Sequence, residues 1–181
     1  MKLYVVRHGQ TDWNVLEKLQ GKTDIELNQT GINQAKKTQE ELANLLFDVI
    51  ITSPLKRAKK TAEIINENKK VPLIVDERIT ERGFGEVEGT NPGDDPNFSK
   101  FEFWNYEKNV NYKNAEPVVE MCDRVWGLLD EIKEKYNYKN VLLVTHGGTM
   151  RTINAYFNGL DENGMIPRIE VLNCEIKEYE F

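Results

Sequence analysis

The chain has 181 residues and a net charge of -6, a size that suits one folded domain and a charge that leaves no footprint for nucleic acid or an anionic membrane. Hydrophobic residues make up 39% of the chain and charged residues 30%, so it can build a core and does not have the composition of a disordered protein. Cys122 and Cys174 are too few for a disulfide framework and form no Cys-x-x-Cys zinc pair, so we expect two buried thiols.

The N-terminal half of the chain alternates short apolar runs with helical patterns. Residues 3–6 predict a buried strand, and because Arg7 ends the run after four residues, it is too short for a signal peptide or a membrane span. A cytoplasmic location is therefore expected. Residues 28–30 can cap a helix whose apolar positions are Ile32, Ala35, Leu42 and Leu45 or Leu46. Residues 47–52 predict a second strand, and Pro54 suits the first turn of the helix that follows.

The C-terminal half continues this alternation. Residues 71–75 predict a third strand, the longest helical pattern covers residues 118–132, and a fourth strand starts at Val141. A further helix opens beyond it, and residues 169–172 and 175–179 predict late edge strands, the kind of strand that pairs antiparallel in such sheets. The order of elements predicts an α/β fold, a three-layer αβα sandwich around a mostly parallel sheet.

One segment, residues 89–115, breaks the alternation. It is rich in Asn, Asp, Pro and Gly, yet it contains six aromatic residues: Phe98, Phe101, Phe103, Trp104, Tyr106 and Tyr112. A solvent-exposed loop has little use for so many aromatic rings, whereas an insertion folded over a pocket needs apolar side chains to pack. We interpret it as a small lid within a single domain of residues 1–181; the alternative is simple packing against the sheet.

The two histidines of the chain, His8 and His146, each precede glycine at the end of an apolar run. In open α/β sheets ligands bind at the carboxyl ends of such strands, so we expect both imidazoles in one pocket. Arg7 lies beside His8, and Arg57 lies just inside the helix after the second strand. Guanidinium groups and the backbone N–H groups at Gly147 suit the oxygens of an anion. The predicted ligand is a phosphoryl group.

Four local strings in this chain resemble the motifs of the histidine phosphatase superfamily, the phosphoglycerate-mutase-like proteins. They occur in the family's order. The first is RHGQTDWN at 7–14, with Gln20-Gly21, Asp24 and residues 27–31 behind it, and the second is SPLKRA at 53–58, continuing to Thr61-Ala62. The third is ERGFG at 81–85, continuing to Glu88-Gly89, and the fourth is THGG at 145–148, continuing to Arg151. Together they span residues 3–157. The resemblance implies a phosphatase or a mutase that works through a phosphorylated histidine.

Carried over to matching positions, the resemblance implies that His8 is the nucleophile and that Arg7, Arg57 and His146 surround the phosphoryl group. A nucleophilic imidazole must be neutral, and two guanidinium neighbours lower the pKa of His8 and so favour that form. Phosphoryl transfer needs mainly positioning and positive charge, which Arg7, Arg57 and a protonated His146 can supply. We therefore expect no metal and no cofactor.

The same resemblance makes Glu81 the proton donor to the leaving oxygen and afterwards the base for water. The residues that it assigns to substrate binding are Asn14, Gln20, Gly21, Arg82 and Gly147. Glu116 stands in the altered string Ala-Glu-Pro, which leaves its contact with substrate open. Arg124 and Arg151 are assigned to helix packing or ion pairs.

Within the family, a cofactor-dependent phosphoglycerate mutase is the alternative to a phosphatase. The chain is short, and Gln10 and Gly148 stand where such mutases usually have Glu and Asn. Residues 89–115 also carry more carboxylates than lysines, which does not suit the enclosure of a second phosphate. We therefore favour a phosphatase of the α-ribazole-phosphatase-type or broad-specificity kind, acting on a small phosphomonoester; an aromatic lid would tolerate a planar or apolar leaving group.

Two other classes of protein are alternatives. A non-enzymatic module that binds phosphorylated ligands would lack the nucleophile or the acid, but both are present. A metal hydrolase built on the two histidines and Asp24 lacks the clusters of ligands that divalent sites require. The oligomeric state is open: Trp126 and the C-terminal edge strand can each support a homodimer or simply complete the core.

Overall fold

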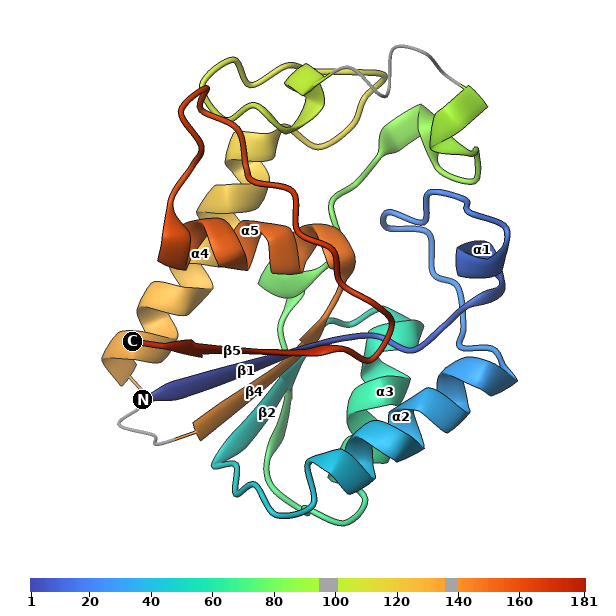
Figure 1. Cartoon of the computed structure of the whole chain (residues 1–181), viewed down its shortest axis with the longest axis vertical. Helices are drawn as coiled ribbons and strands as arrows, with labels where there is room; N and C mark the ends of the chain where they lie inside the picture. The colour runs from blue at the N-terminus through green and yellow to red at the C-terminus, as the bar shows by residue number, and fades with distance from the viewer. Residues whose placement is uncertain (95–100, 136–139) are drawn as a thin grey trace.

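The computed structural model describes residues 1–94, 101–135 and 140–181, and it contains a five-stranded sheet with the strand order β3-β2-β4-β1-β5 (Figure 1). The strands are β1 (Lys2–Arg7), β2 (Val49–Thr52), β3 (Leu73–Val75), β4 (Asn140–Thr145) and β5 (Ile176–Glu180). The first four run parallel, and β5 pairs antiparallel with β1 at one edge. The prediction of a mostly parallel sheet with a late antiparallel edge strand is confirmed.

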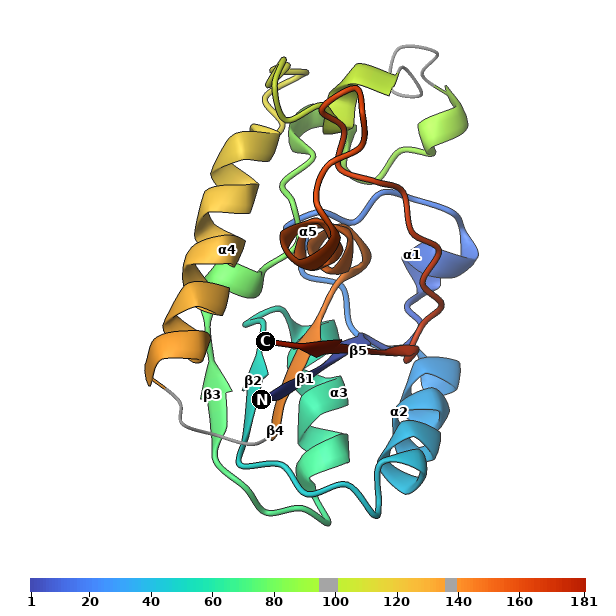
Figure 2. The same ribbon diagram turned by 60° about the vertical axis from the view of Figure 1, so that its left-hand side comes forward.

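Helices cover both faces of this sheet. The α-helices are α1 (Asp12–Val15), α2 (Gln29–Glu41), α3 (Lys56–Asn66), α4 (Val118–Lys135) and α5 (Gly147–Asn158). The 3-10 turns are η1 (Glu77–Ile79), η2 (Gly85–Val87), η3 (Pro92–Asp94) and η4 (Phe101–Trp104). Helices α2 and α3 lie on one face, and α4 and α5 lie on the other (Figure 2). The three-layer αβα sandwich is therefore confirmed. Among the described residues, no helix is both long enough and apolar enough to cross a membrane.

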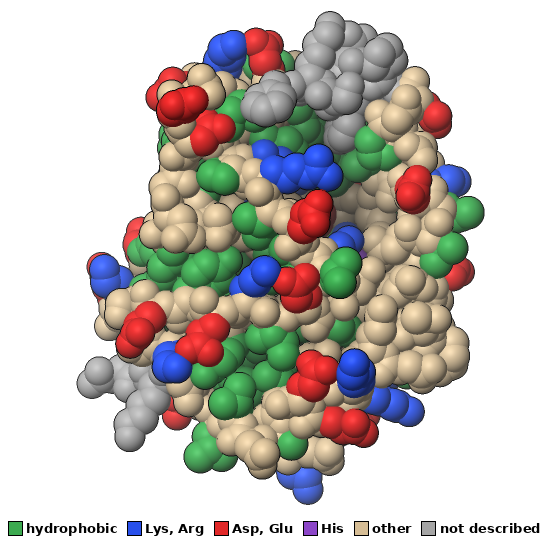
Figure 3. Space-filling model, in the orientation of Figure 1, with side chains coloured by type: hydrophobic (Ala, Val, Ile, Leu, Met, Phe, Trp, Pro, Cys, Tyr) green, Lys and Arg blue, Asp and Glu red, His purple; other side chains and the backbone are tan. Residues whose placement is uncertain are grey.

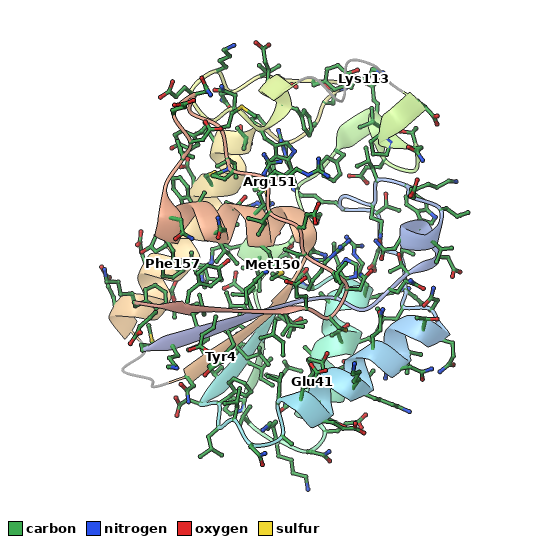
Figure 4. All side chains as sticks on the ribbon, in the orientation of Figure 1. Tyr4, Glu41, Lys113, Met150, Arg151 and Phe157 are labelled. Carbon is green, nitrogen blue, oxygen red and sulfur yellow. The ribbon has the colours of Figure 1, made fainter. Side chains whose placement is uncertain are left out.

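The continuous apolar run of β1 is explained by burial on both faces of the sheet. Leu3 and Val5 pack in the cluster beneath α4 and α5, and Tyr4 and Val6 pack in the cluster beneath α2 and α3. A strand that is covered on one face only would alternate apolar with polar residues. Met150, labelled in Figure 4, belongs to the α4–α5 cluster, which ties the start of α5 to the core just after His146.

Three details of the predicted elements are wrong. Residues 169–172 form no strand, because their backbone is used by side chains: Val171 O accepts from Arg7, and Leu172 N donates to Glu175. Helix α2 ends at Glu41, so Leu45 and Leu46, the alternatives for its last apolar position, both lie beyond it. Leu46 is 80% exposed. Pro54 precedes the helix cap at Leu55 and is not part of the first turn of α3.

The aromatic segment packs largely on itself and on α4. Phe103 and Tyr112 join Phe84, Val87 and Ala115 in one apolar cluster. In Figure 1 this segment lies above α5, at the opposite end of the molecule from the N-terminus. Its role as a lid stays a prediction, and Phe98 lies outside the described residues.

Trp126 faces the interior of the molecule. Its ring stacks on Tyr106, and its indole N–H donates to Thr152 O of α5. Of its two predicted roles, completing the core is the one that these contacts support. Both cysteines are buried and free, as expected.

Candidate active site

The two histidines meet at the carboxyl ends of adjacent strands. Strands β1 and β4 pair in parallel up to Arg7 and Thr145, and His8 N donates to Thr145 O at 2.9 Å. The two imidazole rings lie 5.2 Å apart between centroids, tilted by 56°. The prediction that the two imidazoles meet is confirmed.

His8 is held as a neutral imidazole with one nitrogen available. Its Nδ1 lies 2.7 Å from Gly9 O, so Nδ1 carries the proton and donates, which leaves the lone pair on Nε2. Burial lowers the pKa of His8 well below 6.5, and the charges of Arg57 and Arg7 act in the same direction. The expected effect of the two guanidinium groups is present, although burial is the larger cause. Nε2 makes no hydrogen bond with any described residue.

His146 is held through Nε2, whereas His8 is held through Nδ1. Its Nε2 lies 2.8 Å from Ser53 Oγ, and its Nδ1 is buried without a partner. Burial lowers the pKa of His146 well below 6.5, with the charge of Arg57 adding to the effect. The protonated His146 expected from the sequence is therefore not the favoured form of the free site, because the sequence did not reveal that the ring is fully buried. An anion bound at Nδ1 would oppose this shift.

Arg7 and Arg57 are braced by backbone carbonyls and not by carboxylates. Arg7 Nη1 donates to Val171 O at 2.7 Å, and Arg57 donates to the carbonyls of Thr23 and Gly21 at 2.8 and 2.7 Å. Neither guanidinium group has an ion pair within the described part of the chain. The Nε of each is buried and unpartnered. Together with His146 Nδ1, the site holds three buried nitrogen atoms that lack an acceptor, which is the arrangement that an anion would complete.

Glu81 lies at the edge of this cluster. Its carboxylate accepts hydrogen bonds from Arg82 N at 2.9 Å and from Gly148 N, at the start of α5, at 3.1 Å. Burial lowers the pKa values of Arg7 and Arg57. Among the nearby charges that raise these pKa values, that of Glu81 has the largest effect. Two backbone N–H groups thus hold the Glu81 carboxylate beside the phosphoryl cluster.

Gly148 lies in close contact with the side chains of Glu81 and Trp104. A Cβ atom at this position would lie 2.5 Å from Glu81 Oε1 and 3.0 Å from the edge of Trp104. Any side chain there, including the asparagine of the mutases, would therefore need Glu81 or Trp104 to move.

The other predicted contacts occupy the loop after β1. Asn14 Oδ1 accepts from Thr11 N and Thr11 Oγ1, which closes a capping box at α1 and leaves Nδ2 without a partner among the described residues. Gln20 is buried, and its Oε1 has no partner. Gly21 acts through Arg57, which donates to its carbonyl. Contacts of Asn14, Gln20 and Gly147 with substrate stay predictions.

The sequence did not single out Glu88, which ties this loop to the Glu81 segment. Its carboxylate accepts from Lys22 N and Phe84 N, and from both Thr23 N and Thr23 Oγ1. Gly21, with φ of +54°, leaves the space that Glu88 fills, because a Cβ there would lie 1.9 Å from Glu88 Oε1. Glu88 stands in the third motif, but one carboxylate among 30 acidic residues carries no signal of its own. Ser53 lies in the second motif but was assigned no role, because its role depends on the position of His146.

Arg82 lies deeper than its predicted substrate contact requires. Its side chain is fully buried and donates to Glu116 O and Phe103 O, and only Nη2 is left without a partner. Arg124 was predicted to serve helix packing or an ion pair, and it makes the ion pair: its guanidinium group contacts the Glu116 carboxylate with two hydrogen bonds, at 2.6 and 2.9 Å. Glu116 is thereby engaged within the protein.

Asp24, the third ligand of the metal-hydrolase alternative, accepts a hydrogen bond from Lys56 N at the start of α3. Within residues 1–94, 101–135 and 140–181, no three His, Cys, Asp or Glu side chains form a group that could hold a metal ion.

Comparison with known proteins agrees with this geometry. Residues 3–181 match the family model described as Histidine phosphatase superfamily (branch 1). A Bacillus subtilis protein named Uncharacterized phosphatase PhoE is 40% identical over 177 residues, which cover 98% of this chain and 86% of the relative. A 2,3-bisphosphoglycerate-dependent phosphoglycerate mutase of Cytophaga hutchinsonii is 29% identical over 99% of this chain and 87% of its own length. The structure of a mycobacterial glucosyl-3-phosphoglycerate phosphatase is 26% identical, with a TM-score of 0.88 over 98% of this chain and 90% of that one.

Proposed function

The chain belongs to the histidine phosphatase superfamily and is a phosphatase, and from this premise we propose that it hydrolyses small phosphomonoesters through a phosphohistidine on His8. The observation that carries the proposal is the set of unpartnered buried nitrogens of Arg7, Arg57 and His146 around a histidine whose Nε2 is free. These groups are placed before any ligand arrives, so binding a phosphoryl group needs little rearrangement.

In the first step His8 Nε2 attacks phosphorus, and the bond from phosphorus to the leaving oxygen breaks. Arg7, Arg57 and His146 stabilise the equatorial oxygens, and Glu81 gives its proton to the leaving oxygen. Neutral His8 starts the step with its lone pair on Nε2, because Gly9 O holds the proton on Nδ1. The products are the free alcohol and a phosphorylated imidazole.

In the second step water attacks the phosphohistidine. Glu81, now a carboxylate, takes a proton from this water, the phosphorus–nitrogen bond breaks, and the electron pair returns to Nε2. Inorganic phosphate leaves, and both His8 and Glu81 regain their starting forms. The carboxyl group of Glu81 thus acts as acid in the first step and, as a carboxylate, as base in the second.

The geometry at Gly148 favours hydrolysis over the mutase alternative. An asparagine at this position would conflict with Glu81 as the carboxylate now lies. The site therefore differs from the mutase pattern at a residue that touches the proposed acid.

The experiment that tests the proposal is hydrolysis of 4-nitrophenyl phosphate by the purified protein in excess EDTA. We expect turnover to be unchanged by chelation, because side-chain cations supply the positive charge. The control adds EDTA to a metal-dependent phosphatase in the same assay. Loss of turnover on chelation would overturn the mechanism. Transfer of the phosphoryl group to a sugar phosphate in place of water would favour the mutase alternative over the phosphatase.

Replacing Ser53 by alanine should lower kcat/KM about tenfold, the order of one hydrogen bond to a charged group. Ser53 Oγ accepts from Leu55 N, so its own proton can be given to His146 Nε2, which keeps the neutral imidazole in the form that donates from Nδ1. Inhibition by inorganic phosphate should weaken in parallel. Thr52→Val, which removes the neighbouring buried hydroxyl, is the matched control and should leave phosphate inhibition unchanged. An equal effect of both variants would make the role of Ser53 merely structural.

A further inference from the structure

Residues 171–175, which lead into β5, hold the chain where it leaves β1. Arg7 makes three contacts with them: its Nη1 donates to Val171 O at 2.7 Å, its backbone N–H donates to Glu175 O at 3.3 Å, and its backbone O accepts from Cys174 N at 3.0 Å. In Figure 1 this segment lies beside the end of β1, and Figure 3, in the same orientation, shows a hollow in the surface next to it. The segment therefore holds the backbone at the residue before the nucleophile.

The side chain of Asn173 extends this hold to the nucleophile itself. Its Nδ2 donates to His8 O at 2.9 Å. A carbonyl oxygen only accepts hydrogen bonds, so the amide group of Asn173 must turn its NH2 toward His8, which settles the orientation of the amide. The two residues lie 165 positions apart in the chain, so this contact exists only in the folded protein.

The peptide unit between His8 and Gly9 is held at both of its ends. His8 O accepts from Asn173, and Gly9 N, at the other end, donates to Thr61 Oγ1 of α3 at 3.0 Å. Gly9 O in turn accepts from His8 Nδ1 and so fixes the tautomer. These hydrogen bonds therefore hold both the backbone from which the imidazole extends and the carbonyl that keeps its proton on Nδ1.

The same amide group also reaches Asn14, a predicted substrate contact. Asn173 Nδ2 lies 3.4 Å from Asn14 Oδ1, which also accepts from Thr11 N and Thr11 Oγ1. Because all three partners donate to the oxygen, the NH2 of Asn14 is the end of the amide that has no partner among the described residues. An N–H donor of this kind suits a phosphoryl oxygen.

We propose that Asn173 is a positioning residue of the phosphatase reaction, whose side-chain amide holds the His8 peptide and Asn14 in a fixed relation to each other. The inference rests on the proposed function and adds to it a residue that lies outside the four motifs. Asn173 acts through His8 and Asn14, and it is assigned no contact with the substrate. A displacement of a reacting group by about 1 Å can cost on the order of a hundredfold in rate, so such a hold affects catalysis.

Asn140 supplies a matched control for Asn173. Its Nδ2 donates to Leu46 O at 2.7 Å, so it too joins two remote segments through a side-chain amide and a backbone carbonyl. Both asparagines are half-buried, but Asn140 lies at the start of β4, at the other end of the sheet from His8. Replacing either one by alanine should therefore shift the melting temperature by a similar few degrees.

The test measures hydrolysis of 4-nitrophenyl phosphate, and its inhibition by inorganic phosphate, for the wild-type chain, Asn173→Ala and Asn140→Ala. Asn173→Ala should lower kcat/KM about tenfold to a hundredfold, because His8 is no longer held in line for attack. Phosphate inhibition should change by less than about threefold, since Arg7, Arg57 and His146 keep their own partners. Asn140→Ala should leave both values unchanged.

Asn173→Asp separates hydrogen bonding from the filling of space. The aspartate side chain has the same shape, but near neutral pH its carboxylate only accepts and cannot donate to His8 O. Its kcat/KM should be at least as low as that of Asn173→Ala, and it carries the test alone if the alanine variant does not fold. Wild-type kcat/KM in Asn173→Asp would mean that the side chain only fills space, and would overturn the inference.

The link to Asn14 is tested by combining variants. In an Asn14→Ala background, Asn173→Ala should cost a smaller factor in kcat/KM than in the wild type, because part of its effect passes through Asn14. Losses that simply multiply would overturn this link.

Failure of the inference is distinguishable from failure of the proposed function. Wild-type turnover with equal losses in Asn173→Ala and Asn140→Ala, or with no loss in Asn173→Ala, would overturn the inference alone. Absence of turnover in the wild-type chain would overturn the proposed function and the inference with it.

Discussion

Replacing His8 by alanine should lower kcat/KM for 4-nitrophenyl phosphate by about a thousandfold or more, the order expected for losing a covalent nucleophile. No other described nucleophile stands at the same place, since His146 is turned so that Nε2 faces Ser53. Arg7 and Arg57 would remain and would still bind phosphate, so the loss should fall on kcat and not on binding. The measurement is steady-state kinetics together with quenching of the reaction in an alkaline denaturant, which should trap a phosphoenzyme in the wild type alone, stable in alkali and lost in acid.

Thermal unfolding distinguishes a loss of folding in this variant from a loss of catalysis. The one hydrogen bond that the His8 side chain makes with a described residue runs to the carbonyl of Gly9, so the variant gives up little that holds distant segments together. We expect thermal unfolding to shift by only a few degrees, and inorganic phosphate to raise the melting temperature of both proteins. A phosphoenzyme that still forms in the variant would show that a different residue is the nucleophile.

Replacing Glu81 by glutamine should make the rate depend on the leaving group. An alkyl phosphate needs a proton on its leaving oxygen and should lose about a hundredfold to a thousandfold in kcat/KM, the usual range for a general acid. A nitrophenolate leaves without a proton, so 4-nitrophenyl phosphate should lose far less in the first step. The measurement is kcat/KM for a series of esters ordered by the pKa of the leaving alcohol.

Glu88→Gln is the matched control for this variant. Glu81 and Glu88 each accept backbone N–H bonds, so either substitution leaves a backbone donor without its acceptor and costs about 1 to 3 kcal/mol in the free energy of unfolding. Only Glu81 contacts Gly148 at the phosphoryl site, so a dependence on leaving group should appear in one variant alone. The same slope in both would show that the effect is a general loosening of the site.

Local patterns were enough to predict most of the fold. Residues 3–6 are apolar on both faces, a pattern that only a strand covered on both sides satisfies, and it lies within β1. Residues 28–30 were predicted to cap a helix, and Asn28 does so, since its side chain accepts from Gly31 N at the start of α2. Errors arose where backbone groups were claimed by distant side chains, as at Val171 with Arg7, because no local pattern records such a partner.

Within the site, the chain order itself determined that His8 and His146 would meet, since each ends a parallel strand with a glycine behind it and parallel strands end at one edge. The charge form of His146, the hydrogen bonds of Glu88 and the stacking of Arg151 on Trp104 were decided only by tertiary structure. Burial and the positions of residues far apart in the chain set each of these, and both come into being only when the layers pack. The sequence thus determined which chemical groups the protein has at its strand ends, and the packed fold decided which of them are neutral, which are paired and which are left free to bind.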